Sequence, residues 1–400
     1  MTGVLIIFLK IRINVGTLNS GTMATSPSGP SRLPVWTNPS ASSFQHTTTT
    51  HLTLAQKFHA NLPAFQRTPL VPLDDLAGEL GVKGIFVKDE SSRLGLPAFK
   101  ILGASWGTFR GVAQYLGLEH DICLDELAAK ARDAGIKLLA ATEGNHGRAV
   151  ARMAKLMGLE VDVYVPKVMD NPTERFITRE GAKVIRVDGD YDAAVAMAAK
   201  DASDCSNSIV IQDNSFEDYE TIPGWIIEGY STLLIEVESQ LHDRGLLATT
   251  IITPVGVGSL AHAVVSFAKS DGRGISVVAV EPVNAACLNN SLKIGHSKPI
   301  ITTETIMAGM NCGSVSPLSW PLLRQGVDAS VTVSDWEAHQ AVQYLQKHGV
   351  NAGPCGAGAL AALRRVAAEN PGSVGVSRDS VVVLLSTEGE REYRVPKDDS

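Results

Sequence analysis

Residues 97–104 read Pro97-Ala98-Phe99-Lys100-Ile101-Leu102-Gly103-Ala104 and place a lysine between a turn and a helix. Gly95 and Pro97 are typical of a turn, and apolar residues recur at helical spacing from Gly103 onward. The apolar neighbours of Lys100 exclude water, and burial lowers the pKa of an ammonium group. A neutral amine near physiological pH is what a Schiff-base lysine needs. The ordinary alternative is a lysine whose stem lies on apolar surface while its charge reaches solvent.

The composition is that of an ordinary globular protein, with 400 residues, 44% of them hydrophobic and 19% charged, and a formal charge of −7. This length predicts two domains and a large core. No basic stretch interleaved with aromatic residues occurs, so we expect a small-molecule substrate and no nucleic-acid partner. Five cysteines without a Cys-x-x-Cys pair argue against a zinc or other metal site and against a secreted disulfide scaffold, which favours a cytoplasmic location.

The first 50 residues differ in composition from the rest of the chain. Residues 4–9 form an apolar run that is too short to span a membrane, and Lys10 and Arg12 follow it, on the wrong side for a signal peptide. We therefore expect no membrane anchor, with a short amphipathic or targeting element over 1–14 as the alternative. Residues 15–50 are rich in Ser, Thr, Gly and Pro, so 1–50 is predicted as a disordered N-terminal extension, with Met23 as an alternative start.

Beyond residue 50, short β-rich runs alternate with helical patterns. The predicted strands are 85–88, 137–141, 161–165, 183–187, 208–212, 249–254, 276–281, 330–333 and 381–386. The predicted helices are 147–157, 173–180, 190–202, 223–241, 260–270, 335–348 and 356–368. Apolar strands separated by helices predict an α/β fold with mostly parallel sheets covered on both faces, which makes each domain three layers thick.

Open parallel sheets bind ligands at the carboxyl ends of their strands, so the loops after the predicted strands are candidate sites. The loop Ala141-Thr142-Glu143-Gly144-Asn145-His146-Gly147 joins a strand to a helix and offers glycines, polar side chains and the N–H groups of a helix N-terminus. A helix cap built on Asn145 explains it equally well. The loop Val255-Gly256-Val257-Gly258-Ser259 forms a concave set of backbone donors suited to one phosphate, or an ordinary strand-to-helix turn.

Three further loops carry polar groups. Asp213 follows the predicted strand 208–212, where helix capping is the simpler explanation of its carboxylate. Residues 353–358 open a helix of small residues, and Cys355 within them is a poor candidate for a nucleophile. Ser386 and Thr387 place hydroxyl groups at the end of the last predicted strand.

Together these motifs resemble the pyridoxal-phosphate (PLP) enzymes of the tryptophan-synthase β-like fold, also called fold-type II, over about residues 55–390. Within that group the chain is most similar to the diaminopropionate ammonia-lyase family. The similarity rests on the stretches Lys88-Asp89-Glu90-Ser91, Ile211-Gln212-Asp213, Ile222-Pro223-Gly224-Trp225-Ile226-Ile227-Glu228-Gly229-Tyr230 and Thr305-Ile306-Met307-Ala308-Gly309-Met310.

The resemblance implies a pyridoxal 5'-phosphate cofactor and a role for each motif. Lys100 would hold the cofactor covalently, and Asn145 would bond the phenolic oxygen of its ring. The phosphate would lie against Gly256, Val257, Gly258 and Ser259, and Ser386 or Thr387 would face the pyridine nitrogen. A large PLP-binding domain would comprise 51–104 and 214–400, and a smaller α/β domain would comprise 105–213. A homodimer is expected.

The implied reaction is an α,β-elimination of ammonia from 2,3-diaminopropionate, with pyruvate and ammonia as products. The leaving amine has to depart protonated, and carboxyl groups in a partly desolvated site can keep it so. Asp213 and Glu143 are the candidates. The family generally has aspartate where this chain has Glu143, and the extra methylene moves the carboxylate by roughly 1.5 Å, which puts the stereochemical preference in question.

Two other functions stay open. A serine or threonine dehydratase of the same fold would use the same lysine, and a PLP-binding protein without strong catalysis would bind the cofactor and turn nothing over. The resemblance also implies that Cys287 and Cys312 approach one another at the rim of the site. A disulfide between them would need Cα atoms within about 7 Å, and a cytosolic setting would keep it reduced or labile.

Overall fold

The computed structural model describes residues 33–47, 52–142, 144–369 and 376–398. The candidate targeting element at 1–14, Met23 and Glu143 lie outside the described residues.

One sheet of the described chain has seven strands in the order β1-β10-β9-β8-β11-β3-β2. Their bounds are β1 (Trp36–Thr37), β10 (Ala329–Val333), β9 (Ser276–Pro282), β8 (Thr250–Pro254), β11 (Val381–Ser386), β3 (Gly84–Asp89) and β2 (Leu70–Pro72). The five central strands run parallel, whereas β1 and β2 pair antiparallel at the two edges.

A second sheet has four parallel strands in the order β6-β5-β4-β7. Their bounds are β6 (Lys183–Val187), β5 (Glu160–Pro166), β4 (Lys137–Ala141) and β7 (Ser208–Val210). All four lie inside the segment 105–213 predicted as the smaller domain, and the strands of the larger sheet lie outside it. The division of the chain into two domains with those boundaries stays a prediction.

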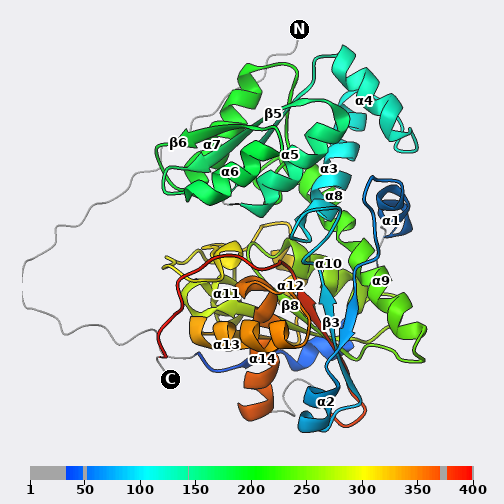
Figure 1. Cartoon of the computed structure of the whole chain (residues 1–400), viewed down its shortest axis with the longest axis vertical. Helices are drawn as coiled ribbons and strands as arrows, with labels where there is room; N and C mark the ends of the chain where they lie inside the picture. Colours follow the sequence, from blue (N-terminus) through cyan, green and yellow to red (C-terminus); the bar gives the residue numbers. More distant parts are fainter. Residues whose placement is uncertain (1–32, 48–51, 143, 370–375, 399–400) are drawn as a thin grey trace, which may run out of the picture. The chain divides into compact units, whose positions relative to one another are not determined.

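Helices connect the strands and cover both sheets (Figure 1). The early helices are α1 (Leu52–Ala60), α2 (Asp74–Leu80), α3 (Lys100–Tyr115), α4 (Leu124–Asp133), α5 (Asn145–Met157), α6 (Asn171–Arg179) and α7 (Tyr191–Asp204). The later helices are α8 (Thr221–Gly229), α9 (Ser231–His242), α10 (Ser259–Ala268), α11 (Cys287–Ile294), α12 (Trp320–Gly326), α13 (Asp335–Lys347) and α14 (Pro354–Glu369). Short 3₁₀ helices cover η1 (Pro39–Ser43), η2 (Val283–Ala285) and η3 (Ala308–Met310). No helix of the described residues is both long and apolar enough to span a membrane.

The seven-stranded sheet is buried on both faces. In β9, Val277 and Ala279 pack into one apolar cluster with α10, whereas Val278 and Val280 pack into another with α13 and α14. This alternation follows from the period of two along a strand, and burial on both faces explains why the strands are apolar throughout. The larger sheet is therefore the middle layer of a three-layer arrangement, as predicted.

A row of glycines lets α3 approach α8 closely. A Cβ atom at Gly103 would lie 2.6 Å from the Tyr230 ring, and one at Gly107 would lie 2.5 Å from Ile226. Real Cβ atoms do not come that close, so these positions need glycine. The contact holds the N-terminal end of α3, which begins with Lys100, against α8.

Two local predictions are wrong. The helix predicted over 223–241 is two helices, α8 and α9, with Tyr230 between them. Gly229, the last residue of α8, packs closely on α3, since a Cβ atom there would lie 2.5 Å from the carbonyl oxygen of Leu102. Part of the predicted disordered extension is ordered, since β1 pairs with β10 and η1 follows it with Ala41 buried. Its composition is polar, but this segment is ordered by contacts with distant strands rather than by a core of its own.

Candidate functional site

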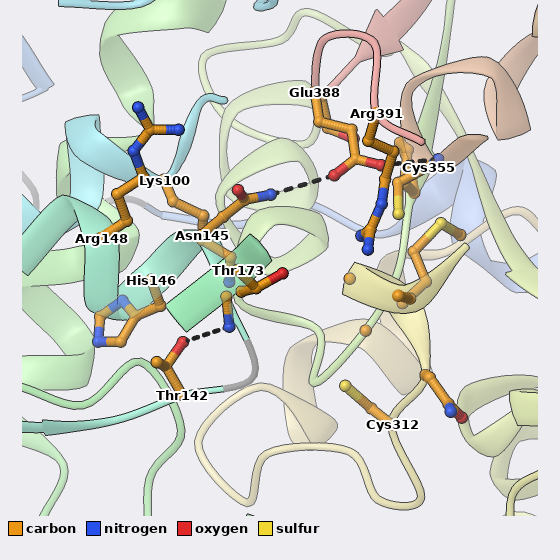
Figure 2. Close-up of a pocket in the computed structure, with 18 of the residues that line it drawn as sticks. Lys100, Thr142, Asn145, His146, Arg148, Thr173, Cys312, Cys355, Glu388 and Arg391 are labelled. Atoms are coloured by element: carbon orange, nitrogen blue, oxygen red, sulfur yellow. Dashed lines mark hydrogen bonds between the residues drawn. The ribbon is translucent and has the colours of Figure 1, made fainter. Parts of the chain in front are cut away.

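A cavity of about 1720 Å³ is lined by the loops at the carboxyl ends of β4, β8 and β11 (Figure 2). Lys100, Asn145 and Asp213 line it, together with the Gly256–Ser259 loop and Thr387. Most of the residues singled out in the sequence therefore meet in one place, because parallel strands bring their carboxyl ends to the same edge.

Lys100 begins α3 and forms an ion pair with Asp213, which is 113 residues away in the sequence. Burial lowers the pKa of Lys100, but the Asp213 carboxylate more than offsets this effect and the pKa is raised above its ordinary value. The prediction of a lowered pKa is therefore wrong for the protein without cofactor, because the apolar neighbours in the sequence are not the groups closest to the amine. The alternative of a lysine that reaches solvent does not hold either, since only 19% of the side chain is exposed.

Asp213 is a buried carboxylate rather than a helix cap. Burial would raise its pKa, but His146 and Lys100 lower it to about 2. His146 donates from Nε2 to the carbonyl oxygen of Ile211 at 2.8 Å, and its other ring nitrogen, Nδ1, faces Asp213 at 3.8 Å. Asp213 is consequently ionised at neutral pH in the protein without cofactor.

The Lys100–Asp213 pair predicts how the stability of the cofactor-free protein depends on pH. Asp213 has a lowered pKa, so its contribution is present above the ordinary carboxyl pKa and is lost as the pH falls towards 2. Lys100 has a raised pKa, so its contribution is present below the ordinary lysine pKa and is lost above it. Near neutral pH, Asp213→Asn should lower the melting temperature by roughly 5 °C, and the difference from wild type should shrink below about pH 4. Thermal melts of both proteins from pH 3 to about pH 9 measure this; a difference that does not change with pH would contradict it.

Asn145 is the first residue of α5, yet it does not cap that helix. The hydroxyl of Thr142 accepts hydrogen bonds from the N–H groups of Gly144 and Gly147, at 2.9 and 3.1 Å. The Asn145 side chain instead donates from Nδ2 to the carboxylate of Glu388 at 3.1 Å (Figure 2). The alternative of a cap built on Asn145 is thus wrong, and the amide lies in the wall of the cavity.

The Gly256–Ser259 loop precedes α10, whose first turn has N–H groups without partners inside the helix. Gly258 has a positive φ of 96°, and a Cβ atom there would lie 2.9 Å from Leu323. A Cβ atom at Gly256 would lie 3.1 Å from the Cys312 sulfur and 3.2 Å from the carbonyl oxygen of Gly309. Glycine is therefore required at Gly258, and it relieves close packing at Gly256.

The end of β11 carries the two predicted hydroxyl groups. Ser386 is completely buried, and its Oγ has no hydrogen-bond partner among the described residues, whereas Thr387 lines the cavity. Pyridoxal phosphate requires an amine, a loop of backbone donors suited to its phosphate and an unpaired hydroxyl. The residues present therefore fit the cofactor implied by the resemblance.

Two other predictions concern residues around this loop. Glu143 lies outside the described residues, so its place relative to Asp213 stays a prediction. Cys287 Sγ lies 3.8 Å from the carbonyl oxygen of Gly256, and Cys312 Sγ packs against the same glycine. Neither forms a disulfide among the described residues, and a disulfide between them also stays a prediction.

Three residues of the site were not singled out in the sequence. Glu388 bonds Asn145, and Arg391 extends into the cavity near Cys355 (Figure 2). Tyr230 is fully buried beside Phe99, with ring centroids 4.9 Å apart, and close enough to influence the pKa of Lys100. Glu388 and Tyr230 lie in or beside stretches noted in the sequence, but nothing local to these stretches indicates which side chain lies close to Asn145 or Lys100.

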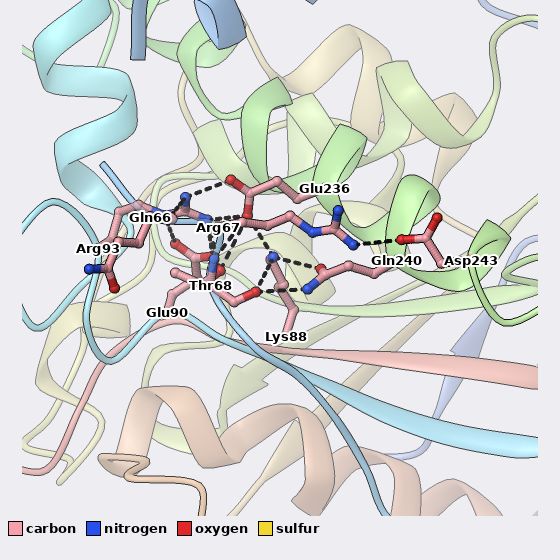
Figure 3. Close-up of polar contacts among 9 residues, drawn as sticks. All are labelled: Gln66, Arg67, Thr68, Lys88, Glu90, Arg93, Glu236, Gln240 and Asp243. Carbon is pink, nitrogen blue, oxygen red and sulfur yellow. Dashed lines mark hydrogen bonds and ion pairs between the residues drawn. The ribbon is translucent and has the colours of Figure 1, made fainter. Parts of the chain in front are cut away.

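A buried ionic network joins Lys88, Glu90 and Arg93, which precede Lys100 in the chain, to Glu236 of α9 (Figure 3). Arg93 donates to both Glu90 and Glu236, and Lys88 donates to Glu236 at 2.6 Å. The exposed fraction of each of these four side chains is 2% or less. Burial lowers the pKa of Arg93, but Glu90 and Glu236 more than offset this and raise it, so the guanidinium stays charged.

The network anchors the segment that leads to Lys100. After Arg93, the N–H of Phe99 donates to the carbonyl oxygen of Thr387 at 3.2 Å, and the N–H of Gly389 donates to that of Pro97 at 2.8 Å. The segment before α3 is thereby held against the end of β11 through Pro97 and Phe99 and against α9 through Arg93.

Comparison with known proteins agrees with this geometry. Residues 62–387 match the family described as "Pyridoxal-phosphate dependent enzyme". The chain is 32% identical to diaminopropionate ammonia-lyase of Escherichia coli K12, covering 85% of this chain and 89% of the relative, and 35% identical to that of Salmonella typhimurium, covering 70% and 71%. The solved structure of the Escherichia coli enzyme with an aminoacrylate-PLP azomethine intermediate superposes with a TM-score of 0.80 at 30% identity, over 90% of this chain and 94% of that one.

The match to that structure confirms the predicted tryptophan-synthase β-like fold and the predicted cofactor. The family match spans most of the chain, including Lys100, Asn145, Asp213 and the Gly256–Ser259 loop. The chain therefore belongs to the pyridoxal-phosphate-dependent enzymes and, within them, to the diaminopropionate ammonia-lyase family.

Proposed function

We propose that this protein catalyses the elimination of ammonia from 2,3-diaminopropionate, giving pyruvate and ammonia. The observation that carries the proposal is the ion pair between Lys100 and Asp213 in a cavity that also contains the Gly256–Ser259 loop. It places an amine and a carboxylate in contact, as proton transfer requires. The membership of the chain in the diaminopropionate ammonia-lyase family supports the substrate.

Lys100 is proposed to hold the cofactor and afterwards to move a proton. When bound, pyridoxal phosphate supplies an electron sink that lowers the cost of removing the proton from Cα of an amino acid. Lys100 reaches the cavity from one side only, because its backbone is fixed at the start of α3. As a free amine it can take a proton only from the face of the substrate that it contacts.

Asp213 is proposed to be a second proton-transfer group. In the protein without cofactor, Lys100 and His146 keep the pKa of Asp213 low. Once the charge on Lys100 is lost, the attraction between the two groups disappears, whereas burial continues to raise the pKa of the carboxyl group. Asp213 can then accept a proton and deliver it to the leaving amine. Glu143 is proposed to act from the loop after β4.

The test of the proposed function is direct. Purified protein should absorb above the protein band because it holds the cofactor, and it should release pyruvate when diaminopropionate is added. Serine and threonine are the comparison substrates, since a dehydratase would release pyruvate from the former and oxobutyrate from the latter. Binding of the cofactor without product from diaminopropionate would contradict the proposal.

We predict that the two carboxylates act on different enantiomers of the substrate. Asp213→Asn should reduce turnover of one enantiomer by about 10²–10⁴-fold, the contribution expected of a positioned acid or base. Glu143→Gln should affect the other enantiomer, or only substrate binding, because its longer side chain has to shift to reach Cα. Separate initial rates with D- and L-diaminopropionate measure the effect. Equal losses on both enantiomers in both variants would rule out this division of roles.

We also infer that the protein acts in the cytoplasm as a homodimer. The first inference is supported by the five scattered cysteines, which are too few and too irregular for a secreted disulfide scaffold. The second is supported by the family to which the chain belongs.

A further inference from the structure

Glu388 lies in the wall of the cavity, where contacts with other segments hold its backbone in place. Its carbonyl oxygen accepts from the N–H of Gly353 at 3.0 Å, and the residue forms an antiparallel bridge with Ala98. The residue is only 5% exposed, and the side chain lies beside Asn145 (Figure 2). Glu388 therefore connects three parts of the site, namely the segment before Lys100, the start of α5 and the start of α14.

The two carboxylate oxygens have different partners. Oε1 accepts from the N–H of Cys355 at 3.2 Å, in the first turn of α14, and Oε2 accepts from Nδ2 of Asn145 at 3.1 Å. A carboxylate can only accept hydrogen bonds, so the amide of Asn145 has to turn its NH₂ group towards Glu388. This contact selects one of the two orientations that an asparagine side chain could otherwise adopt.

The amide nitrogen has two hydrogens, and the bond to Glu388 uses one of them. The second has no acceptor among the described residues, and Asn145 lines the cavity. A hydrogen so placed is available to an acceptor on a bound molecule. If the amide were reversed, its carbonyl oxygen would face the carboxylate and the two acceptors would repel.

We propose that Glu388 is a positioning residue that orients Asn145, so that the second N–H of the amide meets the phenolic oxygen of the cofactor ring. The inference rests on the proposed function and on the role that the family resemblance implies for Asn145. Glu388 does not act on the reacting atoms in this arrangement. Its other oxygen accepts from the N–H of Cys355, which is one of the N–H groups at the start of α14 that have no partner inside the helix.

The test measures cofactor binding and not turnover, so it is independent of the substrate. The full chain is freed of cofactor and titrated with pyridoxal phosphate, and the dissociation constant and the absorbance maximum of the bound cofactor are recorded. Glu388→Gln should weaken binding by about tenfold and shift the absorbance maximum, because an amide cannot accept from both donors at once. Glu119→Gln is the control. It removes the same charge from an exposed side chain that does not line the cavity, and it should leave both quantities unchanged.

A double-mutant cycle separates positioning from other effects. In an Asn145→Ala background, Glu388→Gln should have no further effect on the dissociation constant, because its only route to the cofactor is gone. A purely structural role at α14 would lower the melting temperature equally in both backgrounds and leave the absorbance maximum unchanged. Unchanged binding and absorbance in Glu388→Gln, an undiminished effect in the Asn145→Ala background, or an equal effect of Glu119→Gln would each overturn the proposal.

A second variant covers the case in which Glu388→Gln does not fold. Glu388→Asp keeps the charge but withdraws the oxygens by about 1.5 Å, so it should weaken cofactor binding in the wild-type background and not in Asn145→Ala. Binding by Glu388→Asp that equals wild type would contradict the inference. If the protein binds pyridoxal phosphate as described but releases no ammonia from diaminopropionate, the proposed function fails and the role of Glu388 stands.

Discussion

Replacing Lys100 with alanine is expected to lower the rate of pyruvate formation by at least about 10³-fold, because the same amine is proposed to hold the cofactor and to transfer the proton. The substitution removes the only side chain that pairs with Asp213 as a cation among the described Lys and Arg residues. Initial rates at saturating substrate, measured at equal cofactor occupancy, report the loss.

Borohydride reduction provides the control for this prediction. In the wild-type protein the reduced cofactor should label the peptide containing Lys100, and in Lys100→Ala no lysine should be labelled. Lys88 is engaged with Glu236 in the buried network, and Lys137 pairs with Asp162 at 2.7 Å, so neither is available. A label on Lys88 or Lys137 would contradict the assignment.

Replacing Arg93 with methionine should destabilise the protein by about 3–5 kcal/mol, which is the cost of removing one partner from a buried ionic group. The guanidinium bonds Glu90 at 2.6 Å and Glu236 at 2.8 Å, and its loss leaves two buried carboxylates with Lys88 alone to compensate them (Figure 3). The melting temperature should fall by roughly 5 °C. Because the network anchors the segment before Lys100, cofactor binding should weaken as well.

The matched control is a salt bridge on the surface. Arg67 pairs with Asp243 at 3.0 Å, with 44% and 61% of the two side chains exposed. Arg67→Met should cost no more than about 1 kcal/mol, because water screens exposed charges. Thermal or chemical unfolding of both variants compares them, and a similar loss in each would show that the buried network does not stabilise the protein.

Much of the fold could be predicted from local patterns. The runs that became β3, β4, β5, β8, β9, β10 and β11 are apolar because both faces of these strands are largely buried, and burial leaves a signal in the sequence itself. The edge strands β1 and β2 left no such signal, since each has only two or three residues and pairs on one side. The break between α8 and α9, at Tyr230, was also missed.

The candidate site, like the fold, could be predicted from the sequence only in part. The loop Gly256–Ser259 and the loop around Asn145 carry their chemistry in consecutive residues, so the sequence alone indicated a phosphate site and a polar helix start. The partners of those residues are far away in the chain. Asn145 meets Glu388 across 243 residues and Lys88 meets Glu236 across 148, and such contacts depend on the order and register of the strands.

The sequence by itself determined that the chain is an α/β protein, that Lys100 begins a helix after a turn, and that glycine loops follow the strands. Only the tertiary structure decided the charge state of Lys100 and the orientation of Asn145. The apolar neighbours of Lys100 predicted a lowered pKa, whereas the ion pair with Asp213 raises it. The reason is physical. Hydrophobicity and helix propensity act between neighbours in the chain, whereas electrostatic and hydrogen-bond energies depend on distances in space that folding sets.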